Sequence, residues 1–166
     1  MLLRAWYFVT LVLTALLMGT SFAHTLEMPA KLAVDGPTWM LFQHTLYPFF
    51  AYVGAPVELG SVFTTLGLAF LLRGQRPAVY IISTAALCFA AAFGLWLGFT
   101  NGVNAETGNW TANSLPSDWA TWRAQWEYSH AVRFALHFCG FTLLALPPIM
   151  ILPNRRWHAV EARKTQ

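Results

Sequence analysis

The sequence predicts an all-α integral membrane protein, a bundle of four membrane-spanning helices with both termini in the cytoplasm. Hydrophobic residues make up 57% of its 166 residues and charged residues only 10%, whereas a soluble domain carries about 25% charged residues. Four apolar stretches are long enough to cross a bilayer, which takes ~20 residues. The basic residues lie at the ends of these stretches and form no basic face. The net charge of +3 therefore indicates membrane topology and no nucleic-acid partner.

The predicted spans cover residues about 5–23, 46–72, 78–99 and 129–152, and residues 1–153 form one domain. Residues 73–77, Arg-Gly-Gln-Arg-Pro, separate the second span from the third, because Gly and Pro break helices and Arg prefers water. The fourth helix is predicted to begin outside the bilayer at Trp119, since Ser117 and Asp118 are good N-cap residues. Residues 154–166 form a basic tail, expected to lie on the cytoplasmic side.

The distribution of Lys and Arg predicts the orientation, because cytoplasmic loops are enriched in both. With the N-terminus inside, the outer side holds only Lys31, Arg123 and Arg133, and the cytoplasmic side holds the other seven: Arg4, Arg73, Arg76, Arg155, Arg156, Arg163 and Lys164. The expected location is the bacterial inner (plasma) membrane. One alternative remains open. The first span also resembles a cleaved signal peptide ending near Ala23, which would leave three spans.

Polar side chains share one face of the fourth helix. At 100° per residue, steps of three and four residues keep them on one stripe. Two His and two Arg occur there, although charged groups are costly in a bilayer. The stripe consists of Trp119, Arg123, Trp126, His130, Arg133, His137, Gly140 and Leu144.

The other helices offer polar partners for this face. In the second helix, Glu58 lies about 20 Å beyond His44 along an unbroken helix, so its carboxyl needs a partner or a proton. The first helix carries His24 near its outer end, and Asn101 and Asn104 follow the third. We expect a pocket among the helices, with His24, His44, Asn101, Asn104 and His130 at its outer mouth and Glu58 near His137 below.

A short motif suggests a family. Residues 122–133 read Trp-Arg-Ala-Gln-Trp-Glu-Tyr-Ser-His-Ala-Val-Arg. This segment resembles the R-x-x-W-E…H-x-x-R entry to the last helix in a family of small four-span membrane proteins that includes the fungal anthrone oxygenases. Residues 27–29, Glu-Met-Pro, closing the first helix, and residues 101–104, Asn-Gly-Val-Asn, after the third agree with it.

The resemblance implies that a lipophilic phenolic, anthrone-like ring is oxidised by molecular oxygen without a cofactor. The reaction needs a base, for which His130 or His137 is suited because imidazole titrates near neutrality. Arg133 and Arg123 would stabilise the oxyanion, and Glu58 would orient His137. Trp126 would stack on the ring, Asn101 and Asn104 would orient the phenol, and His24 and His44 would complete the binding residues.

Two other functions remain open at this point. The His and Glu side chains are suitable ligands for a metal or haem, although no HExxH or CxxCH motif occurs and no metal site is predicted. A non-enzymatic binding or transport subunit also suits four spans, although no inverted repeat supports transport. Beyond the lipid bilayer, a lipophilic small molecule is the expected partner. Cys88 and Cys139 lie inside apolar runs and are expected to be small packing residues.

Overall fold

The structure is a computed structural model that describes residues 1–150, and within them it contains helices and no strands. Four helices are long and apolar enough to cross a membrane. The prediction of an all-helical membrane protein with four spans is therefore confirmed. In chain order the elements are α1 (Leu2–Ala33), α2 (Gly36–Thr45), α3 (Tyr47–Leu71), α4 (Arg76–Leu95), the π-helix η1 (Trp96–Thr100), α5 (Asn101–Thr107) and α6 (Trp119–Met150).

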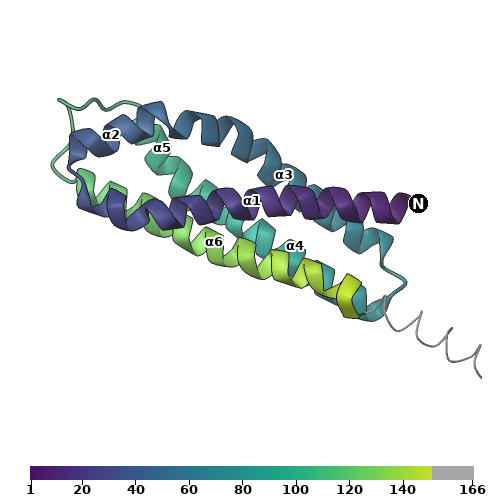
Figure 1. The fold of residues 1–166 in the computed structure, drawn as a ribbon. Coiled ribbons are helices and arrows are strands. Elements are labelled where there is room, and N and C mark those ends of the chain that lie inside the picture. The colour runs from purple at the N-terminus through teal and green to yellow at the C-terminus, as the bar shows by residue number, and fades with distance from the viewer. Residues whose placement is uncertain (151–166) are drawn as a thin grey trace, which may run out of the picture.

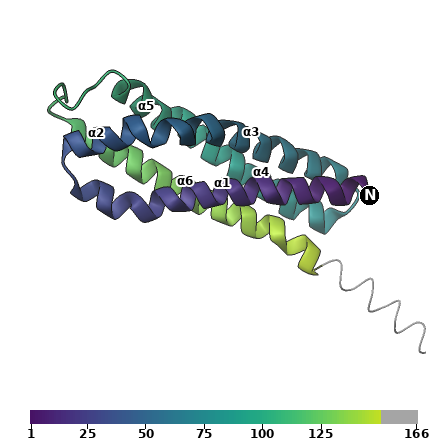
Figure 2. The same cartoon turned by 45° about the horizontal axis from the view of Figure 1, so that its top comes forward.

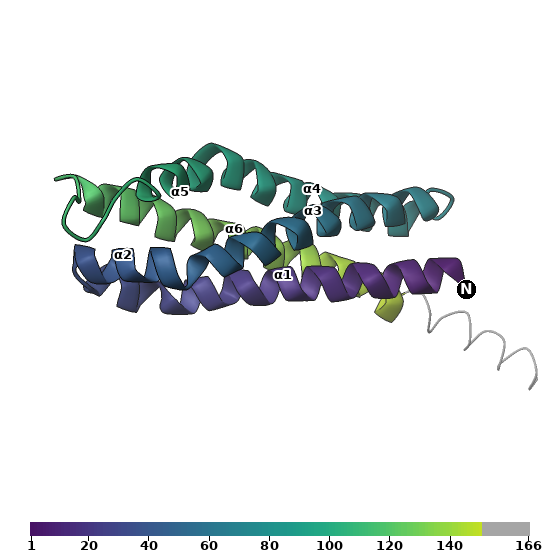
Figure 3. The same ribbon diagram turned by 90° about the horizontal axis from the view of Figure 1, so that it is seen from above.

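The four long helices form an elongated up-and-down bundle (Figure 1). The main packing pairs are α1 with α3, α3 with α4, α4 with α6, and α6 with α1, so α3 and α6 lie diagonally across the bundle. The N-terminus and the turn between α3 and α4 are at one end (Figure 2). The short helices α2 and α5 and the connection into α6 are at the other end (Figure 3). We call this second end the α2/α5 end.

The side chains are distributed as expected for a protein surrounded by lipid. Large apolar side chains face outward along the spans, among them Phe8, Phe63, Phe70, Leu87 and Val132. Many buried side chains are instead polar, including Thr10, Thr14, Ser21, Ser61 and Thr65. Their hydroxyls mostly bond to carbonyls of the preceding helical turn, as Thr14 does to Thr10 at 2.8 Å. Small polar residues of this kind permit close helix packing in a bilayer.

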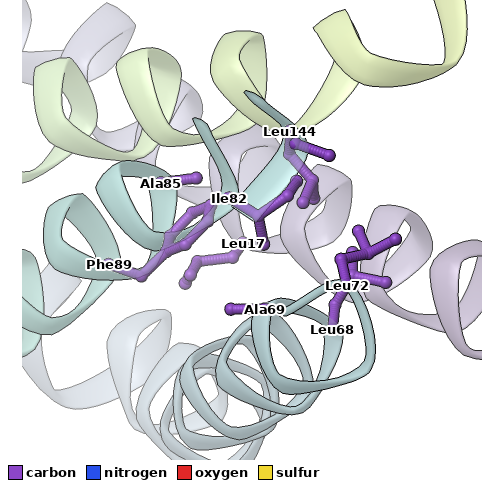
Figure 4. Close-up of a cluster of buried hydrophobic side chains, with 9 residues drawn as sticks. Leu17, Leu68, Ala69, Leu72, Ile82, Ala85, Phe89 and Leu144 are labelled. Atoms are coloured by element: carbon purple, nitrogen blue, oxygen red, sulfur yellow. The ribbon is translucent and has the colours of Figure 1, made fainter. Parts of the chain in front are cut away.

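The half of the bundle away from α2 and α5 has an apolar core. Figure 4 shows side chains from all four long helices converging there: Leu17, Leu68, Ala69, Leu72, Ile82, Ala85, Phe89 and Leu144. Glycines allow large rings to approach the helices closely. A Cβ on Gly67 would lie 2.7 Å from Cζ2 of Trp6, and one on Gly140 would lie 3.0 Å from Cζ of Phe89. The buried charged and imidazole side chains are concentrated in the other half.

Two predicted boundaries are wrong at the α2/α5 end. The first helix does not close at residues 27–29 but continues to Ala33 with Pro29 inside it. Its end is held by Arg123, whose Nη1 donates to the carbonyls of Lys31 (3.1 Å) and Val34 (2.6 Å). The third helix does not end near residue 99, because η1 and α5 carry it on to Thr107. In both places the extra helical turns pack onto an aromatic cluster that contains Trp39, Tyr47 and Trp126.

Helix α6 begins at Trp119, as predicted. Asp35 caps α2 by accepting a hydrogen bond from the Thr38 amide at 3.0 Å, which holds the pKa of its exposed carboxyl below the usual value. Residues 151–152 of the predicted fourth span and the basic tail at 154–166 lie outside the described residues.

Candidate functional site

A cavity of approximately 300 Å³ lies in the polar half of the bundle. Residues of α1, α2, α3, α4, η1, α5 and α6 line it, so the whole bundle contributes to its wall. Its lining runs from Gln43, His44 and Thr107 at the α2/α5 end to Glu58 and Arg133 deeper between the helices. The volume is at the small end of the ~300–1,000 Å³ of typical ligand pockets. Such a site suits a small molecule of a few rings.

Aromatic and imidazole rings form one wall of this cavity. The His24 ring lies 4.6 Å from that of His130 and meets Trp126 edge-on at 5.3 Å. Tyr47 and Phe50 complete the wall, with their ring centroids 5.0 and 4.8 Å from His24. Three helices therefore place two imidazoles within a cluster of apolar ring faces. The wall can accept a flat ligand and offers it titratable nitrogens.

One hydrogen bond fixes the proton position on His130. Its Nδ1 lies 2.9 Å from the carbonyl oxygen of Trp126, one helical turn earlier. Because a carbonyl oxygen can only accept, Nδ1 must carry the proton. The neutral ring then has its lone pair on Nε2, so Nε2 is the atom that can accept a proton from a ligand.

The floor of the cavity is an ion pair. Arg133 Nη2 donates to Glu58 Oε2 at 2.6 Å, and the two residues are 7% and 3% exposed. The pair joins α3 to α6 across the diagonal of the bundle. Each side chain thereby neutralises a charge that would be costly in a bilayer on its own.

His137 stabilises this floor from behind. It is fully buried and does not line the cavity. Its Nε2 lies 3.5 Å from Glu58 Oε1, so the expected contact between the two residues is present. Its Nδ1 shares a hydrogen bond of 2.7 Å with Ser21 Oγ. These contacts place His137 as a support for Glu58, and His130 is the better placed of the two proposed bases.

The structure contains a second buried ion pair that the sequence analysis missed. Lys31 Nζ lies 2.9 Å from Glu127 Oε2, and both residues are almost fully buried. The Lys31 ammonium also lies over the rings of Trp126 (4.6 Å) and Tyr47 (5.0 Å). From the sequence, Lys31 is expected on the outer side of the membrane. Lys31 follows His24 at a helical spacing that keeps it on the buried face of α1, and this spacing could have predicted its burial.

The remaining predicted binding residues divide into two groups. Asn104 lines the cavity and accepts a hydrogen bond from Trp126 Nε1 at 2.8 Å. His44 is also in the lining, where its Nε2 donates to the Thr107 carbonyl at 3.1 Å. Asn101 and Arg123 are not in the lining. Asn101 is exposed on α5, and Arg123 is engaged by the end of α1 and stacks on Trp119 at 4.5 Å.

Within residues 1–150, no group of three or more His, Cys, Asp or Glu side chains is arranged to hold a metal ion. No protein-family model, curated protein or solved structure matches the chain. The geometry of the cavity therefore has to support any functional conclusion.

Proposed function

We propose that this protein oxidises a lipophilic phenolic, anthrone-like compound with molecular oxygen inside the cavity. It would belong to the anthrone-oxygenase-like family of four-span proteins and act without a cofactor. In this proposal both termini are cytoplasmic, the membrane is the bacterial inner membrane, and the α2/α5 end with the start of α6 extends on the outer side. The substrate would enter from the bilayer, where such compounds concentrate.

The observation that carries the proposal is the position of the proton on the His130 imidazole. Its proton is held on Nδ1 by the Trp126 carbonyl, which leaves Nε2 as a base within a cavity walled by aromatic rings. A positioned imidazole typically accelerates proton transfer by about 10²–10⁴-fold. A base that is placed beside ring faces suits the removal of an acidic proton from a ring carbon.

The proposed reaction is balanced with oxygen as the only oxidant. His130 takes a proton from the ring CH₂ that lies opposite the carbonyl, and the electron pair of the broken C–H bond delocalises into an enolate. Oxygen accepts these electrons and forms a C–O bond, and the returned proton completes a hydroperoxide. Loss of water then breaks the O–O bond and leaves a second carbonyl. The net change is CH₂ plus O₂ to C=O plus H₂O.

The surroundings of His130 support the charged step. Arg133 lines the floor and provides guanidinium N–H groups for the enolate oxygen. Glu58 holds that guanidinium in place, and His137 holds Glu58. Trp126 and Phe50 provide apolar ring faces beside the substrate.

Oxygen uptake by the purified protein tests the proposal. With 1,8-dihydroxy-9-anthrone as substrate we expect uptake by the wild type at a rate well above the spontaneous rate. His130→Asn keeps an N–H donor for the Trp126 carbonyl and removes the base, so uptake should fall by about 10²-fold or more. Tyr128→Phe, an exposed position on the same helix, is the matched control and should be unchanged. Equal activity of His130→Asn and wild type would refute the assignment of the base.

A non-enzymatic ligand-binding protein is the second candidate, because the aromatic wall alone is sufficient for binding. Measuring anthrone binding alongside oxygen uptake separates the two functions. If wild-type protein binds the anthrone without enhanced oxygen uptake, the oxidation proposal fails and the binding function replaces it.

A further inference from the structure

Four buried polar side chains in the cavity lining have an atom without a hydrogen-bond partner among residues 1–150. One is Glu58 Oε1, which lies 3.5 Å from His137 Nε2. The other three are Arg133 Nε at the floor, Gln43 Nε2 at the α2/α5 end, and His24 Nδ1 between them. Each of the three residues is only 7% exposed. A buried donor without an acceptor is costly, and native proteins leave few of them. Unpaired donors at both ends of one cavity indicate a ligand that accepts at both ends.

The positions of these donors define the shape of the ligand. Gln43 lies next to the start of α3, and Arg133 pairs with Glu58 farther along that helix. Between Tyr47 and Glu58 an α-helix rises about 16 Å. Even with side chains reaching inward, one six-membered ring is too short to contact both ends. The ligand is therefore elongated.

The charges around the cavity define the charge of the ligand. Arg133 is paired with Glu58 at 2.6 Å, and Lys31 is paired with Glu127 at 2.9 Å. Glu27 lies 3.6 Å from the same Lys31 and adds a further carboxylate. With the histidines counted as neutral, the only cation in the described cavity lining is Arg133, and it is already paired with a carboxylate. A ligand carboxylate would thus be buried without a countercharge, which is strongly unfavourable.

We propose that the cavity selects a neutral, elongated, lipophilic compound with an acceptor oxygen at each end, and that it rejects the carboxylated analogue. One oxygen accepts from Arg133 Nε and the other from Gln43 Nε2. This inference rests on the proposed function for the location of the site and adds the chemical class of its ligand. It makes Gln43 a specificity-determining residue, although no pattern in the sequence pointed to it.

Three probes on one ring frame test this selection by binding alone, because none of them can be oxidised by the proposed reaction. They are 2,6-dimethoxyanthraquinone, with oxygens at both ends, 2,6-dimethylanthraquinone, which lacks them, and anthraquinone-2-carboxylate. Ligand-induced thermal stabilisation of the full-length protein in detergent gives the affinities. We expect the dimethoxy probe to bind best, and the carboxylate to bind about tenfold more weakly or worse.

Gln43→Leu is the informative variant. It should lower the affinity for the dimethoxy probe about fivefold, as expected for one lost hydrogen bond, and leave the affinity for the dimethyl probe unchanged. Since Gln43 Nε2 has no protein partner, the ligand-free variant should be at least as stable as wild type. A merely structural role for Gln43 would instead lower this stability and weaken both probes. The double variant Arg133→Met with Glu58→Gln tests how the ion pair at the floor contributes to probe affinity, without leaving a buried charge unpaired.

Three results would overturn the inference: equal affinity for the carboxylate, an equal effect of Gln43→Leu on both neutral probes, or no binding of any probe. The proposed oxidation is judged separately by oxygen uptake with the anthrone. Selective binding without uptake would retain the inference and remove the oxidation. Oxygen uptake together with unselective probe binding would retain the oxidation and remove the inference.

Discussion

The Glu58–Arg133 pair gives a prediction that distinguishes the two partners. Both side chains are buried, and their contact of 2.6 Å joins diagonal helices. Removing one member of a buried ion pair costs about 3–5 kcal/mol, because the other charge stays in the low-dielectric interior. The two single variants should nevertheless differ. A guanidinium cannot give up its proton in a protein, whereas a carboxyl can take one up.

We therefore expect Glu58→Gln to lower the free energy of unfolding by about 3–5 kcal/mol. Arg133→Met should cost less, because Glu58 can become neutral and still lies 3.5 Å from His137. The double variant removes both charges, so its cost should be at least ~1 kcal/mol smaller than the sum of the two single costs. Unfolding of the purified protein in mixed micelles with rising SDS, followed by far-UV circular dichroism, gives all four free energies.

Ser61→Ala is the matched control for a buried polar residue on the same helix. The Ser61 hydroxyl donates to the Val57 carbonyl of its own helix at 2.7 Å, so its loss should cost less than ~1 kcal/mol. The reasoning would be refuted if Glu58→Gln were as stable as Ser61→Ala. It would also be refuted if the single costs simply added in the double variant, because the two charges would then not be coupled.

Two further predictions concern helix packing and the end of α1. Gly67→Ala should destabilise the protein by about 1–3 kcal/mol, as overpacking does, because the new Cβ would lie 2.7 Å from the Trp6 ring. Gly19→Ala, which meets nothing within 4 Å, should instead stabilise it by about 0.5–1 kcal/mol in the same unfolding assay. Arg123→Gln should lower stability by about 1–3 kcal/mol, since its guanidinium binds two carbonyls at the end of α1. Probe affinity should be unchanged because Arg123 is outside the cavity lining, and a loss of binding with unchanged stability would contradict this role.

Much of the fold follows from the sequence alone, because its causes are local. Apolar stretches of span length predict membrane helices whatever their neighbours are, and residues 73–77 break the chain at the observed turn. The helical period also predicted which face of α6 turns inward. Trp126, His130, Arg133, His137, Gly140 and Leu144 are all buried, because side chains three and four residues apart share one face in any helix.

The contacts between helices were decided only by the tertiary structure. Rotation and axial position determine which side chains meet, and neither is a local property of the sequence. Asn101 belongs to the same short helix as Asn104, yet only Asn104 reaches the cavity. Arg123 lies on the predicted face of α6, but the extension of α1 to Ala33 provides it with carbonyls. Lys31 is buried against Glu127 for the same reason: α1 continues beside α6 where a loop was expected. The sequence thus determined which faces are polar, and the packing of α1, α3 and α6 decided which polar groups form the site.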